Sequence, residues 1–78
     1  MKVGILASGG LGFSILCKIS QKYELSFVMT DRSSDSIHSF CDTHSLPIFV
    51  GNPREGKSND FLSRVSCDVL ISINYIFL

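Results

Sequence analysis

The segment Val3-Gly-Ile-Leu-Ala-Ser-Gly-Gly-Leu-Gly12 decides the fold of this chain. Its apolar start, over residues 2–7, lacks polar alternation, which is typical of a strand buried on both faces of a parallel sheet. The glycine-rich turn that follows allows close backbone approach and positive φ angles. Residues 13–22 then carry apolar side chains at helical spacing. The segment therefore predicts a strand, a tight turn and a helix.

The same alternation continues along the rest of the 78 residues. Further strands are expected at 25–30, 47–50 and 69–73, with a helix before Pro47 and a short helix near 58–65. The order is βαβαβαβ, which predicts an α/β fold: a three-layer, Rossmann-like half with a four-stranded parallel sheet. In such sheets ligands bind beyond the carboxyl ends of the strands.

Composition excludes several classes of function. Seven Lys and Arg balance seven Asp and Glu, so no basic surface calls for nucleic acid. No apolar run approaches the roughly 18 residues of a membrane span, and the start lacks the pattern of a signal peptide. Three widely spaced cysteines favour reduced thiols in a cytoplasmic protein. Residues 68–78 are largely apolar and lack a polar tail, so residues 1–78 are interpreted as the amino-terminal part of a truncated domain.

The glycine turn is a candidate anion site. Its residues are Ser8, Gly9, Gly10 and Gly12. A helix that begins behind them would present free N–H groups and partial positive charge, which suit a phosphate or carboxylate. An alternative is a dinucleotide site, in which Asp31 would bind a ribose, although Ile15 stands where that motif needs Gly or Ala. A tight turn without a ligand is the third interpretation.

Two further patterns are weaker. Residues 51–58, Gly-Asn-Pro-Arg-Glu-Gly-Lys-Ser, match the phosphate-loop pattern, but Glu55 would repel phosphates and Pro53 removes an N–H group. A polar surface loop is the simpler interpretation. His38, Cys41 and His44 share helical spacing, yet they fan across a helix and no fourth ligand is evident, so no metal site is predicted.

Four segments together resemble the folate-dependent formyltransferase family, which includes the glycinamide ribonucleotide, methionyl-tRNA and sugar-nucleotide enzymes. They cover the chain in the family's order and spacing: Val3-Gly-Ile-Leu-Ala-Ser-Gly-Gly10, Val28-Met-Thr-Asp-Arg32, Leu46-Pro-Ile-Phe-Val50 and Asp68-Val-Leu-Ile-Ser-Ile-Asn-Tyr-Ile-Phe-Leu78. The chain is similar to about the first third of a typical member.

The resemblance implies transfer of a formyl group from 10-formyltetrahydrofolate to a small-molecule amine. It implies that Ser8, Gly9, Gly10 and Gly12 hold the substrate phosphate and that Ile76, Phe77 and Leu78 begin the folate-binding loop. Leu11 and Phe13 depart from the purine enzyme, and an amino-sugar nucleotide is slightly favoured as substrate; a tRNA partner is implied only for the methionyl-tRNA type.

The family's catalytic Asn-x-His motif and later Asp have no counterpart here, since residues 74–76 read Asn-Tyr-Ile and both histidines lie elsewhere. No catalytic residue is therefore assigned, and the chain is expected to be inactive alone. Two other hypotheses stay open: a stand-alone nucleotide-binding module, and a remnant that does not fold stably.

Overall fold

Four parallel strands form the centre of the computed structural model, which describes residues 1–77 apart from the side chain of Glu55. The strands pair in the order β3-β2-β1-β4. Their bounds are Lys2–Ala7 (β1), Glu24–Thr30 (β2), Ile48–Val50 (β3) and Val69–Ile73 (β4). The connecting elements are α1 (Gly9–Ser20), α2 (Asp35–Thr43), the 3-10 turn η1 (Arg54–Gly56) and α3 (Asn59–Ser63).

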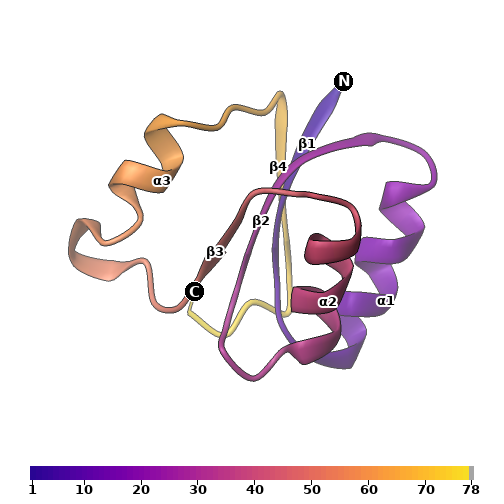
Figure 1. Cartoon of the computed structure of the whole chain (residues 1–78), viewed down its shortest axis with the longest axis horizontal. Coiled ribbons are helices and arrows are strands. Elements are labelled where there is room, and N and C mark those ends of the chain that lie inside the picture. The colour runs from indigo at the N-terminus through magenta and orange to yellow at the C-terminus, as the bar shows by residue number, and fades with distance from the viewer. Residues whose placement is uncertain (78) are drawn as a thin grey trace.

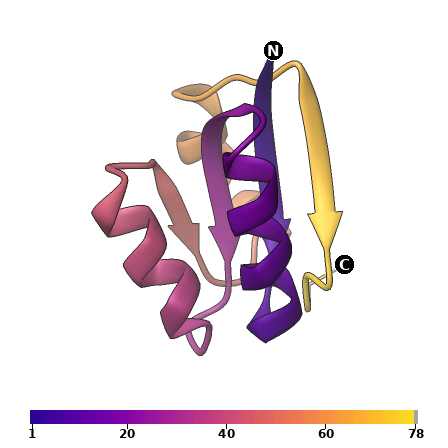
Figure 2. The same ribbon diagram turned by 90° about the vertical axis from the view of Figure 1, so that its right-hand side faces the viewer.

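The helices divide between the two faces of the sheet. Helices α1 and α2 lie together on one face, and α3 lies on the other (Figure 1). Figure 2 shows α1 and α2 in front of the sheet, with all four strands running in the same direction. The predicted α/β class and the three-layer, four-stranded parallel arrangement are thus confirmed. Among the described helices, none has the length and apolar character needed to cross a membrane.

Alternate residues of β1 supply two separate cores. Val3, Ile5 and Ala7 pack under α1 and α2, where they meet Leu16 and Ile37. On the other face Leu6 packs with Phe27, Met29 and Tyr75, and Phe61 of α3 covers them. Period-two alternation along a strand explains this division, and a strand that is apolar on both faces needs helices on both.

Gly4 makes room for an aromatic ring in the second core. The ring of Phe27 lies directly over the Gly4 backbone, where a Cβ atom would be 2.5 Å from Cζ of Phe27. The same ring contacts Phe61 edge-on, with centroids 5.8 Å apart. Glycine at this position therefore lets a large side chain pack flat against the central strand.

A bulge in β2 directs neighbouring apolar residues to opposite faces. Val3 pairs with Leu25 and Gly4 pairs with Phe27, so Ser26 is an extra residue in the ladder. Without it, Leu25 and Phe27 would face the same side. Leu25 instead packs against the core under α1 and α2, and Phe27 packs against the core under α3. The hydroxyl of Ser26 donates to the carbonyl of Ser66, which anchors the bulge.

The observed helix bounds correct the sequence-based ones. Helix α1 begins at Gly9, not after the glycine turn. Only Gly9 among the early glycines takes a positive φ, of 71°, so the backbone of the glycines after it can continue the helix. Helix α2 ends at Thr43, well before Pro47. Its end is a Schellman motif: Ser45 has a φ of 54°, and the N–H of Leu46 donates to the carbonyl of Cys41 at 2.9 Å.

Candidate functional site

The carboxyl ends of all four strands meet at one edge of the sheet, toward the lower end of the molecule in Figure 2. The segments that follow the strands are tied to one another. The side-chain amide of Asn74 donates to the carbonyl of Ser8 at 3.3 Å, and the N–H of Ile76 donates to the hydroxyl of Ser8 at 3.3 Å. The hydroxyl of Tyr75 reaches the carbonyl of Gly51 at 3.5 Å. The segments after β1, β3 and β4 thus form one connected surface.

This edge contains a cavity of about 470 Å³, here named the carboxyl-edge pocket. Its volume lies in the range of small-molecule sites. It lies where ligands bind in parallel α/β sheets. Its lining comes from the end of β3, from the segments after β2, β3 and β4 and from the loop before α3: Asp31, Arg32, Ser33, Phe49, Val50, Gly51, Asn52, Lys57, Ile76 and Phe77.

One side of the carboxyl-edge pocket is apolar. Phe49, Val50, Ile76 and Phe77 contribute it, and Phe77 packs edge-on against the buried Tyr75 with centroids 5.5 Å apart. Ile76 leaves 62% of its surface exposed, so a ligand in the pocket could cover it. Ile76 and Phe77, two of the residues predicted to begin a folate loop, therefore line this pocket. The third, Leu78, lies outside the described residues.

The carboxyl-edge pocket has more positively than negatively charged side chains among its described residues. Arg32 and Lys57 bring two cations, and Asp31 brings one carboxylate. Both oxygens of Asp31 already accept hydrogen bonds, from the Ser34 hydroxyl and from the N–H of Ser33 at 3.0 Å. Burial alone would raise the pKa of Asp31, but the hydrogen bonds from Ser34, Ser33 and Ser8 together outweigh it and lower the pKa. Asp31 is thus a structural carboxylate that holds the start of α2.

The glycine turn divides between ligand-accessible and structural positions. Gly9 and Gly10 are exposed and line a smaller cavity of about 290 Å³ beside the start of α2, which Asp35 also lines. The N–H of Gly9 already donates to the hydroxyl of Ser34 at 2.9 Å. Ser8 is buried, and it holds the segment after β4 through its hydroxyl and carbonyl.

Gly12 belongs to α1 and lies on the buried side of the helix, where it meets the sheet. A Cβ atom there would be 3.1 Å from Cβ of Ala7 and 3.3 Å from the carbonyl oxygen of Ile73. Gly12 therefore supplies the close helix-strand packing that a dinucleotide motif assigns to its third glycine, the position of Ile15 here. That the glycine turn binds a phosphate stays a prediction, and Gly9 and Gly10 are its exposed members.

The phosphate-loop pattern over residues 51–58 takes an irregular course. The amide oxygen of Asn52 accepts the N–H of Arg54 at 3.0 Å, and the η1 turn follows. Ser58 is buried, and α3 after it has five residues. Lys57 is the member of the pattern that reaches the carboxyl-edge pocket together with Gly51 and Asn52.

His38, Cys41 and His44 each have a local partner. His38 Nε2 lies 2.8 Å from the carbonyl oxygen of Asp31, and His44 stacks on Phe40 with ring centroids 4.2 Å apart. Cys41 is buried in the core under α1 and α2, and burial raises the pKa of its thiol to about 11. Among the side chains that the structure describes, no three metal-ligating groups gather at one point.

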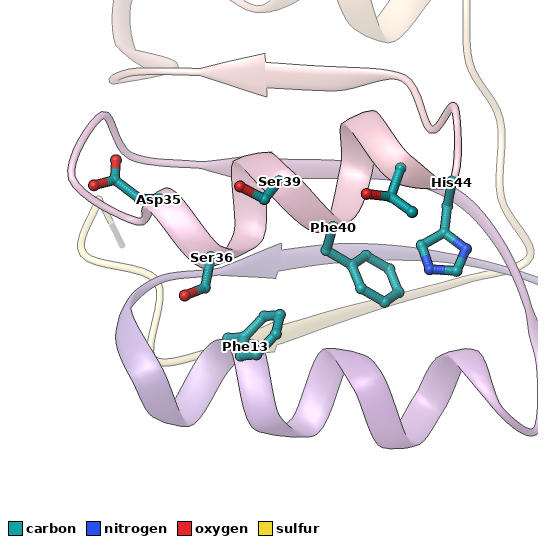
Figure 3. Close-up of a pocket in the computed structure, with 7 residues that line it drawn as sticks. Phe13, Asp35, Ser36, Ser39, Phe40 and His44 are labelled. Carbon is teal, nitrogen blue, oxygen red and sulfur yellow. The ribbon is translucent and has the colours of Figure 1, made fainter.

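A second concavity lies on the outer side of α1 and α2. Figure 3 shows Phe13 of α1 facing Phe40 of α2, with Asp35, Ser36 and Ser39 along one side. The cavity measures about 370 Å³, and the two phenyl rings meet edge-on with centroids 6.4 Å apart. Its described lining comes from α1, α2 and the residue after α2, whereas residues of three strand ends converge on the carboxyl-edge pocket, which is therefore the better candidate site.

The sequence analysis did not predict that Arg32 and Lys57 line the same pocket. The two residues belong to segments 25 positions apart, and only the parallel pairing of β2 with β3 brings them to one pocket. A usable signal was present, because each follows a predicted strand.

No family model matches this chain, and no curated protein matches it.

Proposed function

We propose that this chain is the amino-terminal part of a folate-dependent formyltransferase that acts on a small-molecule amine. One observation carries the proposal: the four segments that resemble the family are the segments whose ends meet at the carboxyl edge of the sheet. Each of these segments contains a strand or the end of one, and the parallel sheet brings the carboxyl ends of its strands to one edge. The segments that resemble the family therefore lie where parallel α/β sheets bind their ligands, which supports the proposal.

The carboxyl-edge pocket has the physical character that a folate needs. The pteridine and benzoyl groups are flat and apolar on their faces, and Phe49, Val50, Ile76 and Phe77 offer apolar surface for them. The bound folate would supply an activated formyl group. The residues of this chain would bind and orient it, and transfer would need the Asn-x-His motif and the aspartate that the 78 residues lack.

Residues 74–76 support a binding role over a catalytic one. Asn74 adopts a φ of 56° and uses its side-chain amide to hold Ser8, and Tyr75 is buried. Both side chains are thereby committed to shaping the loop after β4. We therefore expect the chain alone to bind folate and to transfer no formyl group.

Calorimetric titration of the purified chain with 5-formyltetrahydrofolate, which does not donate its formyl group readily, tests the proposal. Ile76→Ala should weaken binding about three- to tenfold, since the ligand would cover part of this aliphatic side chain. Leu70→Ala is the matched control, because Leu70 is 57% exposed on β4 and does not line the pocket. No heat of binding at millimolar folate, or equal effects of both variants, would contradict the proposal.

The coding sequence gives a second test. If the reading frame continues or resumes beyond codon 78, an Asn-x-His motif should follow roughly twenty residues on, with an Asp later. Unrelated sequence after a true stop codon would leave no catalytic claim for this locus.

A stand-alone nucleotide-binding module is the second candidate, favoured by the two cations of the carboxyl-edge pocket. Against its dinucleotide form stands Asp31, which is buried and whose two oxygens each already accept an internal hydrogen bond, so the carboxylate is largely occupied in holding the start of α2. Titration with NAD or ATP distinguishes this candidate, which requires nucleotide binding without folate binding.

A further inference from the structure

We propose that Arg32 and Lys57 form an anion subsite in the carboxyl-edge pocket, and that this subsite, in place of the glycine turn, takes the phosphate groups of the ligand. The identification of that ligand as the amine substrate rests on the proposed function. The subsite itself rests on the charges and hydrogen bonds at this edge of the sheet.

The first support is the pairing of cations from two loops. Arg32 follows β2 and Lys57 precedes α3, and both line the same cavity. In the part of the chain that the structure describes, the ion pair present joins Arg64 to Asp60, so neither Arg32 nor Lys57 is in direct contact with a described carboxylate. Arg offers a planar fork for phosphate oxygens and Lys adds a compact charge, which is a common combination for phosphate binding.

The second support is the state of Asp31, the one carboxylate in the described lining of the pocket. Its oxygens accept hydrogen bonds from Ser33 and Ser34, which draw its charge toward the start of α2. The described titratable residues of the lining sum to one net positive charge, from two cations and one anion. These described charges attract an anion such as a phosphate.

The third support is that the glycine turn is poorly suited to the same ligand. The N–H of Gly9 is already used by Ser34. The cavity beside Gly9 and Gly10 is lined by Asp35 and by no Lys or Arg among its described residues. A phosphate there would meet a carboxylate without a compensating cation.

Calorimetric titration of the whole chain with inorganic pyrophosphate, at low ionic strength, tests the subsite. Arg32→Gln and Lys57→Gln should each weaken binding about tenfold, because each removes a charge-assisted contact. Lys18→Gln is the charge-matched control, since Lys18 is exposed on α1 and does not line the pocket. It should change binding less than about twofold. Equal weakening in all three variants would overturn the proposal, because it would show only a general response to net charge.

The variant Gly10→Asp tests the alternative that the glycine turn holds the phosphate. A Cβ atom at Gly10 meets no other atom within 4 Å, and an acid in the first turn of α1 suits the helix dipole, so the variant should fold. If Arg32 and Lys57 hold the phosphate, this variant should bind pyrophosphate nearly as the parent chain does. Loss of binding in Gly10→Asp, with Arg32→Gln and Lys57→Gln unchanged, would assign the phosphate to the glycine turn and overturn the proposal.

Titrations with L-glutamate and with 5-formyltetrahydrofolate distinguish a phosphate from a carboxylate ligand, and the anion subsite from the proposed function. L-Glutamate probes a carboxylate such as a folate tail, and binding as tight as that of pyrophosphate would refute the assignment to phosphate. If the parent chain binds pyrophosphate in the expected pattern but no 5-formyltetrahydrofolate, the proposed function fails and the subsite stands. If folate binds and pyrophosphate does not, the subsite fails alone.

Discussion

Substitution of Gly4 by alanine places a Cβ atom 2.5 Å from Cζ and 2.6 Å from Cε1 of Phe27. Carbon atoms in contact lie about 3.5–4.0 Å apart, so the ring must move by about 1 Å or more. Phe27 is 3% exposed and packs against Phe61, so it has little room to move. Sulfur of Cys67 also lies 3.2 Å from the new atom.

The expected cost is that of overpacking a tight core, about 1–3 kcal/mol. A chain of this length is expected to have a total stability of about 4–12 kcal/mol, so the loss is large enough to measure. Phe27→Leu removes Cζ and Cε1 and should cost about 1–2 kcal/mol by itself. Because the added methyl group then fills part of the space left by the ring, the double variant should cost about as much as Phe27→Leu alone.

Urea unfolding followed by far-ultraviolet circular dichroism, on the four members of this double-mutant cycle, measures the coupling. Strong non-additivity is expected, with the double variant more stable than the sum of the single effects. Additive losses would refute the reasoning, since they would show that Gly4 is needed for a reason other than the Phe27 ring. A changed slope with urea would instead indicate that the transition is no longer two-state.

Two other predictions follow from local geometry. Ser45→Gly should raise stability by about 1 kcal/mol and the melting temperature by about 4–8 °C, because Ser45 has a φ of 54° and glycine adopts this region without strain; an unchanged or lower melting temperature would contradict this. Burial opposes ionisation of Asp31 but its hydrogen bonds prevail, so its folded pKa lies below the ordinary value of about 3.9. Its contribution to stability is therefore full above that ordinary value and is lost as the pH falls through the folded pKa, and Asp31→Asn should make unfolding in urea less dependent on pH in this acid range.

The strands could be predicted closely because burial on both faces leaves a plain signal. Apolar runs fixed β1 and β4 at their observed bounds, and β2 began one residue earlier than expected. The bulge at Ser26 could not be predicted, since the alternation around it fits a regular strand equally well. The predicted start of α1 was wrong because glycines favour turns. In the structure the helix includes these glycines, and Gly12 packs closely against Ala7 and Ile73.

The candidate site was predictable in its location and less so in its members. The rule for parallel sheets predicts a site at the carboxyl edge, where the structure has a cavity of about 470 Å³. The sequence does not distinguish Ser8 and Gly12 from Gly9 and Gly10 within the glycine turn. In the structure the first two are buried and the other two are exposed. No local pattern relates Arg32 to Lys57, and the sequence signal for their proximity was only that each follows a strand of the predicted parallel sheet.

The position of β1 between β2 and β4 has a consequence for synthesis in the cell. Val3 pairs with Val69, and the N–H of Asp68 donates to the carbonyl of Lys2 at 2.8 Å, across a sequence separation of 66 residues. A ribosome adds about 5–20 residues per second, so β1 waits about 3–13 s for its second neighbour. Throughout that interval the most buried strand of the sheet has an unpaired edge, which a chaperone or another nascent chain can bind before the sheet is complete.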